Sequence, residues 1–173
     1  MEEKVTQLYL IRHGIAADRE AYRQDQERPL TSKGSHKTGQ VAKQLKNKGL
    51  HFDLILTSPL VRARETAVIL QQAGLSDQIE ELSSLAPEGD IHHWLDWLES
   101  DWENVSRKHS EQCLAMVGHQ PDLGNWAETL AWGEAQEKIV LKKAGVIGLN
   151  LPKTGTPVGK SELFLLISPK WML

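Results

Sequence analysis

The sequence predicts an α/β fold: a three-layer sandwich with helices on both faces of a mainly parallel central sheet. Two observations support this class. Short apolar runs rich in aliphatic and β-branched residues alternate along the chain with longer segments that have a helical period. Glycine and proline stand at many of the junctions between the two kinds of segment. The length of 173 residues suits one domain, which we assign to residues 1–173.

The first hundred residues alternate between strand and helix patterns. Each predicted strand is a short apolar run, and each predicted helix begins near a capping residue or a proline. Gly49 and Gly74 end the first two helices. In order, the predicted elements are a strand over 5–11, a helix from Thr31 or Ser32 to Gly49, a strand over 53–58, a helix over about 60–73, a strand over 79–82 and a helix over 89–100.

The remaining residues predict a strand, a helix and then a mostly β region. Residues 112–119 form a buried strand, and a helix follows to about Trp132. Residues 152–160 contain two prolines and two glycines, which predicts a surface loop. Because short loops join the final strands, we expect them to pair antiparallel. These last residues predict two or three strands, at 138–141, 146–151 and 162–167.

The composition excludes several classes of protein. Hydrophobic residues make up 40% and charged residues 25%, as in ordinary globular domains. The net charge of −3 argues against binding to nucleic acid or to an anionic membrane, and no apolar run approaches the roughly 20 residues of a membrane helix. The apolar start is too short for a signal peptide, and the single cysteine, Cys113, excludes an intrachain disulfide. We therefore expect a cytoplasmic protein.

Polar and cationic residues follow three of the predicted strands. Arg12, His13 and Gly14 come after the first strand. Arg62 lies in the first turn of the helix after the second strand, and His119 ends the strand over 112–119. Ligands of open α/β sheets bind outside the carboxyl ends of the strands, where these side chains would meet. We expect them to form one cationic site.

The chemistry of this cluster suits a phosphoryl group. Arginine donates paired hydrogen bonds to phosphate oxygens, and helix N-termini add backbone donors and partial positive charge. A histidine beside two fixed cations has its protonated form disfavoured, which leaves a neutral, nucleophilic imidazole. Such a histidine can attack phosphorus to give a phosphoramidate, which water then cleaves. The residues therefore predict phosphoryl transfer through a phosphohistidine.

Four ordered motifs carry a resemblance to a known family. LYLIRHG, RPLTSKG, LTSPLVRARETA and MVGHQPDLG follow one another over nearly the whole chain. They resemble the histidine phosphatase superfamily, the phosphoglycerate mutase-like proteins, and the length is similar to its small SixA-like phosphohistidine phosphatase branch. The resemblance implies that His13 is the phosphorylated nucleophile. It also implies that Arg12, Arg62 and Gly14 bind phosphate. His119 would contact the phosphoryl group and stabilise its charge.

A proton donor is less well defined by the sequence. Members of the superfamily with other substrates often carry a glutamate after the third strand, where this chain reads SSLAPEGD. Glu88 and Asp90 are the candidates in that segment. An alkoxide leaving group needs protonation as its bond breaks, whereas a protonated phosphoimidazole leaves as a neutral ring and needs less help.

The site predicted by the sequence is open enough for a protein substrate. No predicted loop exceeds about 20 residues, so the long insertions that cap the site in sugar-phosphate mutases are absent. We expect the substrate to be phosphohistidine on a signalling protein, such as a histidine phosphotransfer domain. Two alternatives stay open. One is a small-molecule phosphomonoester phosphatase or mutase with the same site, and the other is a noncatalytic phosphate-binding module.

We expect neither a metal nor another cofactor. His92 and His93 are adjacent and would point about 100° apart on a helix, so they cannot chelate one ion together. The single cysteine and the absence of an H-x-x-x-H pair give no other metal motif. Five tryptophans between positions 94 and 132 predict core packing, with a rim for a protein partner around the site as the alternative.

Overall fold

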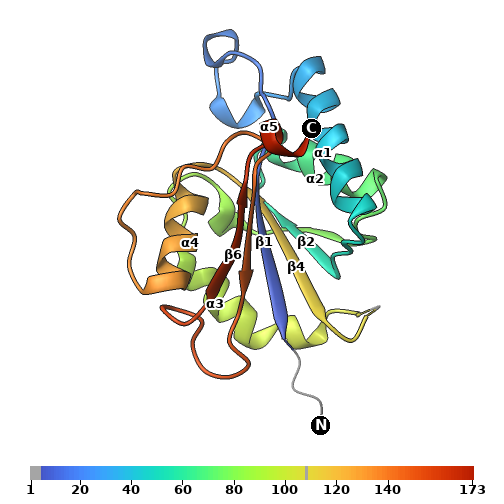
Figure 1. Cartoon of the computed structure of the whole chain (residues 1–173). Coiled ribbons are helices and arrows are strands. Elements are labelled where there is room, and N and C mark those ends of the chain that lie inside the picture. Colours follow the sequence, from blue (N-terminus) through green and yellow to red (C-terminus); the bar gives the residue numbers. More distant parts are fainter. Residues whose placement is uncertain (1–4, 108) are drawn as a thin grey trace.

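The computed structural model describes residues 5–107 and 109–173, and its strands join one six-stranded sheet (Figure 1). The strands are β1 (Thr6–Arg12), β2 (Leu54–Thr57), β3 (Ile79–Glu81), β4 (Gln112–Gly118), β5 (Val146–Asn150) and β6 (Glu162–Ile167). Their order in the sheet is β3-β2-β4-β1-β5-β6. The first four run parallel, β5 is antiparallel to β1, and β6 is antiparallel to β5. The predicted α/β class is confirmed.

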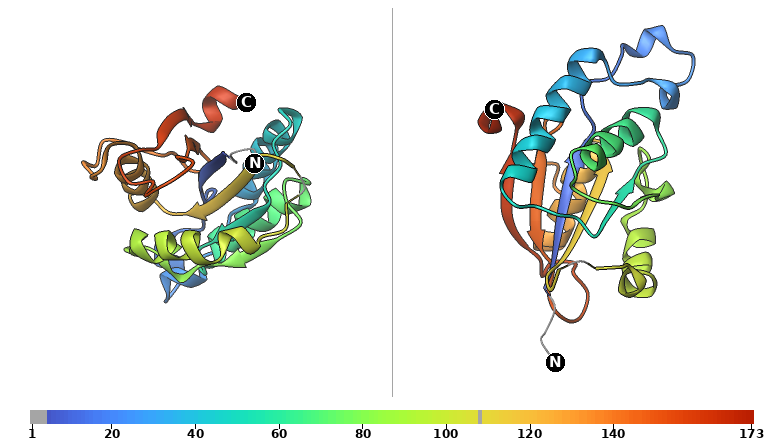
Figure 2. Two further views of the ribbon diagram at one scale, coloured as in Figure 1. Left: turned by 90° about the horizontal axis from the view of Figure 1, so that it is seen from below. Right: turned by 90° about the vertical axis from the view of Figure 1, so that its right-hand side faces the viewer.

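Helices cover both faces of the sheet, as the two views of Figure 2 show. The helices are α1 (Ser32–Asn47), α2 (Val61–Gln72), α3 (Ile91–Ser100), α4 (Asp122–Trp132) and the short α5 (Pro169–Met172). Single 3-10 turns are η1 (Arg19–Ala21), η2 (Asp25–Glu27), η3 (Ser83–Leu85) and η4 (Trp102–Asn104). Of the two predicted caps for α1, Thr31 is the one used, because its Oγ1 accepts a hydrogen bond from Gly34 N at 2.9 Å.

Alternation along β1 divides the core into two layers. Leu8 and Leu10 face α3 and α4, where they belong to the same buried cluster as Trp94. Tyr9 and Ile11 face the opposite way, into the cluster formed with α1 and α2. Full burial of each such side chain stabilises the fold by about 1.5–3 kcal/mol. β1 is therefore packed on both faces, and it holds the residues at its carboxyl end in fixed positions.

The strand predicted over residues 138–141 is wrong. This segment pairs with no strand in the described chain, and side chains bind its backbone instead. Glu128, which is buried in α4, accepts hydrogen bonds from Lys138 N at 2.6 Å and from Ile139 N at 2.9 Å. Gln120 Nε2 donates to Ile139 O at 2.8 Å. The apolar pattern of this segment resembles that of a strand. The position beside β1 is taken by β5, however, so the segment does not pair with β1.

The other predicted elements are confirmed, with their ends shifted by one or two residues. Residues 152–160 contain neither helix nor strand, as the predicted loop requires. Within residues 5–107 and 109–173, no helix combines the length and apolarity needed to cross a membrane.

Candidate active site

The carboxyl ends of three neighbouring strands bring the predicted residues together. β4 lies between β1 and β2, and His13, Ser58 and His119 directly follow these three strands. His13 N donates to Gly118 O at 3.0 Å, and Ser58 N donates to Val117 O at 2.9 Å, so backbone hydrogen bonds align the strand ends. The ring centroids of His13 and His119 lie 5.1 Å apart. This spacing lets both rings contact one tetrahedral group.

Two contacts fix the orientation of the buried His13 ring. Nδ1 lies 2.7 Å from Gly14 O, so Nδ1 carries the ring proton and donates it to that carbonyl. Arg62 Nε donates to Nε2 at 3.3 Å, which requires an unprotonated Nε2. Nε2 is therefore the unprotonated nitrogen, whose lone pair can act as a nucleophile once an anion takes over the Arg62 donor.

Ser58 orients the second histidine, His119. His119 Nε2 lies 2.8 Å from Ser58 Oγ, and that oxygen accepts a hydrogen bond from Leu60 N at 3.2 Å. The Ser58 hydroxyl can donate to Nε2 or accept from it, so this contact fixes the ring's position with either tautomer. Nδ1 is buried and has no hydrogen-bond partner among the described residues. Nδ1 is therefore the ring nitrogen of His119 that a bound anion could engage.

Asp25, in turn η2, holds the guanidinium of Arg62. The Arg62 side chain is 5% exposed, and its Nη2 lies 2.9 Å from Asp25 Oδ2, while its Nη1 donates to Asp25 O at 2.8 Å. Arg28 Nε binds the other carboxylate oxygen at 2.8 Å. Burial alone would raise the pKa of Asp25, yet the hydrogen bonds from Arg62 and Arg28 lower it overall. Asp25 is therefore ionised and fixes two cations at the site.

Arg12 reaches the same site from the end of β1. Its Nη1 donates to Leu141 O at 2.9 Å, so the irregular segment over residues 138–141 orients this side chain. Its Nε is buried and has no partner within the described ranges. Arg12 thus keeps donors that an anion could use.

Burial keeps the two histidines neutral. It is the main cause that lowers the pKa of His13 to about 3. The hydrogen bond to Gly14 O opposes this change, and the charges of His119, Arg62 and Arg12 add to it. Burial, and then the charge of Arg62, lower the pKa of His119 to about 4. Neighbouring cations were expected to produce this effect, and burial proves to be the larger cause.

Two glycines let the loop after β1 pass close to α1. A Cβ atom at Gly14 would collide with Thr38 Oγ1, and one at Gly34 would collide with the backbone carbonyl of Ile15. Gly14 N also donates to Thr66 Oγ1 at 3.1 Å, which ties the loop to α2. The tight packing keeps Gly14 O within reach of the His13 ring.

Four of the predicted site residues, Arg12, His13, Arg62 and His119, line one pocket of about 440 Å³, whereas Gly14 does not line it. Asp25, Arg28 and Lys143 contribute to its walls along with both histidines. In the part of the chain that the structure describes, no tryptophan lines this pocket, so the structure favours core packing over the alternative of an aromatic rim. Core packing explains three of the five tryptophans, which are buried at positions 94, 102 and 126.

The two predicted proton donors lie in different environments. Glu88 is exposed and lines the pocket. Asp90 lies outside it and caps α3, because its Oδ1 accepts from His92 N at 2.9 Å. Asp122, at the start of α4, also lines the pocket and accepts from Glu88 N at 2.8 Å. Burial raises the pKa of Asp122, the hydrogen bond from Glu88 N opposes this, and the charge of Glu88 adds to it.

The sequence reasoning missed the roles of Asp25, Ser58 and Asp122 at this site. Ser58 stands at a strand end, which was a usable signal. Asp25 lies in a polar loop that gives no local signal, since its partner Arg62 is distant in the sequence.

Among residues 5–107 and 109–173, no group of three or more histidine, cysteine, aspartate or glutamate side chains could hold a metal ion.

The fold and the sequence place this chain in a known superfamily of phosphatases. A sequence model of the histidine phosphatase superfamily (branch 1) matches residues 8–134, and the chain belongs to this superfamily. Within it, the chain is similar to the phosphohistidine phosphatase SixA of Escherichia coli (strain K12), with 27% identity over 154 residues, covering 87% of this chain and 89% of SixA.

A structural comparison also supports the SixA-like branch. The structure of the protein histidine phosphatase SixA complexed with tungstate has a TM-score of 0.80 and 25% identity, covering 96% of this chain and 99% of that one. An uncharacterized protein of Picosynechococcus sp. (strain ATCC 27264 / PCC 7002 / PR-6) is 49% identical over 168 residues, 96% of this chain and 99% of that protein. Small-molecule phosphatases, such as the α-ribazole phosphatase of Shigella flexneri, share the fold alone, at 18% identity and a TM-score of 0.64.

Proposed function

We propose that this protein is a metal-independent phosphatase that forms a phosphohistidine on His13, and that its substrate is phosphohistidine in a signalling protein. One observation carries the proposal. The unprotonated Nε2 of His13 lies in a pocket that also contains Arg12, Arg62 and His119, whose buried Nδ1 has no partner among the described residues. A neutral nucleophile surrounded by fixed donors suits transfer of a dianionic phosphoryl group.

The reaction proceeds in two displacements. In the first, the Nε2 lone pair of His13 attacks phosphorus, and the bond between phosphorus and the imidazole nitrogen of the substrate breaks. The leaving imidazole is protonated on its other nitrogen, so it departs as a neutral ring. In the second, water attacks the phosphoryl group and the bond between phosphorus and Nε2 of His13 breaks. The phosphate product carries both hydrogens of the water and exchanges them with solvent, and the His13 ring returns to its neutral state.

The donors around His13 stabilise charge on the equatorial oxygens. Arg62 is held by Asp25, and Arg12 by Leu141 O, so neither guanidinium has to be ordered during the reaction. His119 can engage the phosphoryl group through Nδ1, since Ser58 binds its Nε2. Because the protein supplies this fixed positive charge, the mechanism needs no metal ion.

Two features support a protein substrate. The chain is similar to SixA, which is named a phosphohistidine phosphatase. The segments beside the pocket are also short, and the one over residues 13–31 contains only the turns η1 and η2 between β1 and α1. A histidine on the surface of a partner protein could therefore reach His13.

A substrate panel tests the proposal. A protein phosphorylated on histidine is compared with sugar phosphates as substrates for the wild type, for His13→Ala and for Arg62→Ala. We expect the highest kcat/KM for the phosphohistidine protein, no turnover by His13→Ala, and weaker binding and turnover by Arg62→Ala. Retained activity of a folded His13→Ala variant would refute the mechanism. A clear preference for sugar phosphates would refute the substrate.

The position of Asp122 favours a second candidate, a small-molecule phosphomonoester phosphatase. A carboxyl group with a raised pKa at the pocket wall can protonate an alkoxide leaving group. In that case Asp122→Asn would reduce the turnover of phosphomonoesters by about 10²-fold or more. If phosphohistidine is the substrate, the same variant should retain most of its activity, because the leaving imidazole needs no acid from the protein.

A further inference from the structure

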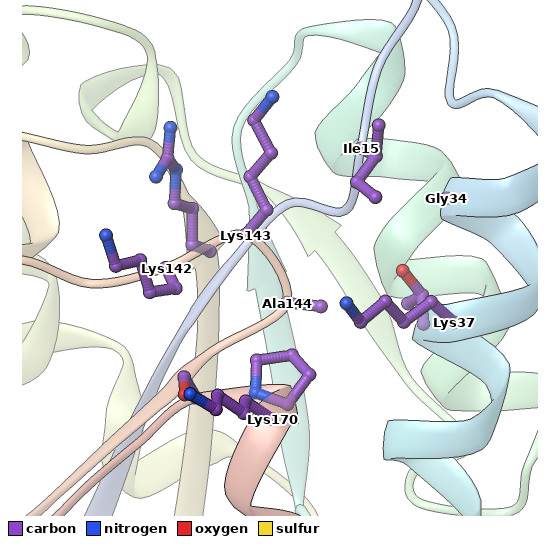
Figure 3. Close-up of a pocket in the computed structure, with 11 residues that line it drawn as sticks. Ile15, Gly34, Lys37, Lys142, Lys143, Ala144 and Lys170 are labelled. Atoms are coloured by element: carbon purple, nitrogen blue, oxygen red, sulfur yellow. The ribbon is translucent and has the colours of Figure 1, made fainter. Parts of the chain in front are cut away.

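A second pocket of about 440 Å³ adjoins the active site and carries an unusual concentration of positive charge. Four lysines line it, and they come from three separate parts of the chain. Lys37 lies on α1, Lys142 and Lys143 lie in the turn before β5, and Lys170 lies on α5 (Figure 3). We call this the lysine pocket.

The lysine pocket lies beside the active site. Arg12 and Lys143 line both cavities, so the two share a wall. The backbone turn after Leu141 forms part of this wall, and Ala144 N in the turn donates to Arg12 O at 3.1 Å. A protein whose phosphohistidine lies at His13 would therefore place its neighbouring residues near the lysine pocket.

The charge in the lysine pocket is not neutralised from within. Among residues 5–107 and 109–173, no acidic side chain lines it. Within the described part of the chain, Lys37, Lys142 and Lys143 form no ion pair with a carboxylate. Lys170 Nζ lies 5.7 Å from the centroid of the Trp171 ring, a contact that leaves its charge in place. The whole chain has a net charge of −3, so this positive cluster is opposite in sign to the charge of the protein as a whole.

The floor of the lysine pocket is apolar. Ile15, Ala144 and Pro169 contribute to it, and Figure 3 shows Lys37 reaching from α1 toward Ala144 across the cavity. A small inorganic anion would use the lysines and leave this floor exposed. An acidic peptide with one apolar side chain would use both features, because the apolar group covers the floor while the carboxylates face the rim.

We infer that the lysine pocket docks an acidic segment of the phosphoprotein substrate, next to its phosphohistidine. The inference rests on the proposed function and specifies it further: this phosphatase selects phosphohistidines that have carboxylates beside them. Exposed charge pairs act over about 8 Å at physiological salt, so the acidic residues must lie close to the phosphohistidine.

Two peptides and two double variants test this inference. The peptides share one phosphohistidine and differ only in flanking glutamates and aspartates, which become glutamines and asparagines in the neutral peptide. The test variant is Lys37→Gln with Lys170→Gln, two lysines that line only the second pocket. The control variant is Lys33→Gln with Lys43→Gln, which removes the same charge from exposed positions of α1 outside that pocket. Inorganic phosphoramidate reports the basal activity.

We expect the wild type to prefer the acidic peptide, and the test variant to lose about three- to tenfold in kcat/KM for that peptide alone. The control variant and all activities toward phosphoramidate should stay unchanged, and the preference should weaken at high salt. Equal use of both peptides by the wild type would overturn the inference, as would an equal loss in the control variant.

The failure of the docking inference can be told apart from failure of the proposed function. If phosphoramidate is hydrolysed but neither peptide is, the proposed substrate is wrong. The affinities of the two unphosphorylated peptides for the wild type then test the lysine pocket independently of catalysis. Tighter binding of the acidic peptide that depends on Lys37 and Lys170 supports docking, and equal binding of both peptides overturns it.

Discussion

Removing the carboxylate of Asp25 should impair phosphoryl transfer without unfolding the protein. Asp25 binds the buried guanidinium of Arg62 through Oδ2 at 2.9 Å and through its backbone oxygen at 2.8 Å, and only the first contact is lost in Asp25→Ala. A hydrogen bond to a charged group contributes about 1.5–3 kcal/mol. At about 1.4 kcal/mol for each factor of ten, the full loss corresponds to roughly 10- to 100-fold in rate.

The expected value lies near the lower end of that range. The Asp25 side chain is 27% exposed, so water screens part of the interaction, and Arg62 keeps its bond to the backbone oxygen. We therefore expect kcat/KM for a phosphohistidine protein to fall by about tenfold in Asp25→Ala. Asp25→Asn should fall less, because its amide oxygen can still accept a hydrogen bond.

Steady-state kinetics and urea unfolding of the same preparations provide the assay. Asp18→Ala is the matched control, since Asp18 is exposed in the same loop and its side chain makes no capping hydrogen bond to η1. The control should retain its activity. If Asp25→Ala remains folded and its kcat/KM stays within about twofold of the wild type, then Asp25 does not position Arg62 for the reaction.

Two further predictions concern stability. Burial lowers the pKa of His13 to about 3 and that of His119 to about 4, so the unfolded chain binds more protons than the native one up to about pH 6.5. The free energy of unfolding should then rise with pH over this range. Each histidine should lower it by about 2 kcal/mol at pH 5 relative to pH 8. His13→Asn should remove the share of His13, which urea titrations of both proteins at the two pH values would measure. Flat titrations would show that the rings are not buried neutral. Gly34→Ala should destabilise by about 1–3 kcal/mol because its Cβ would collide with Ile15 O, whereas Gly39→Ala, in open space on the same helix, should stabilise by about 1 kcal/mol. Equal melting temperatures for the two variants would contradict the close approach at Gly34.

Local patterns were sufficient to predict most of the fold. The strands β1, β2 and β4 are continuous apolar runs, and the helices begin and end at capping residues, prolines and glycines. The strand predicted over 138–141 was wrong because the same apolar pattern also occurs in true strands. Here Glu128, on α4, accepts hydrogen bonds from the backbone of this segment and holds it in an irregular conformation. No local pattern reports a partner ten residues away that arrives through tertiary packing.

The same division applies to the active site. His13, Arg12, Arg62 and His119 stand at strand ends or a helix start, so topology alone brings them to one edge of the sheet. Their partners are set by side-chain packing across the fold. The contact of Ser58 with His119 and that of Asp25 with Arg62 join distant parts of the chain, and Asp90 proved to be a helix cap. Residue types at strand ends predict the reaction, whereas the positioning of those residues requires the structure.

The most direct test is whether the phosphoryl group passes through His13. A single turnover of a phosphohistidine protein is quenched in alkali, and the peptide that contains His13 is analysed by mass spectrometry for a covalently bound phosphoryl group. We expect the modification on His13 in the wild type, and neither modification nor turnover in a folded His13→Ala variant. Phosphorylation of a different residue, or full turnover by His13→Ala, would contradict the account.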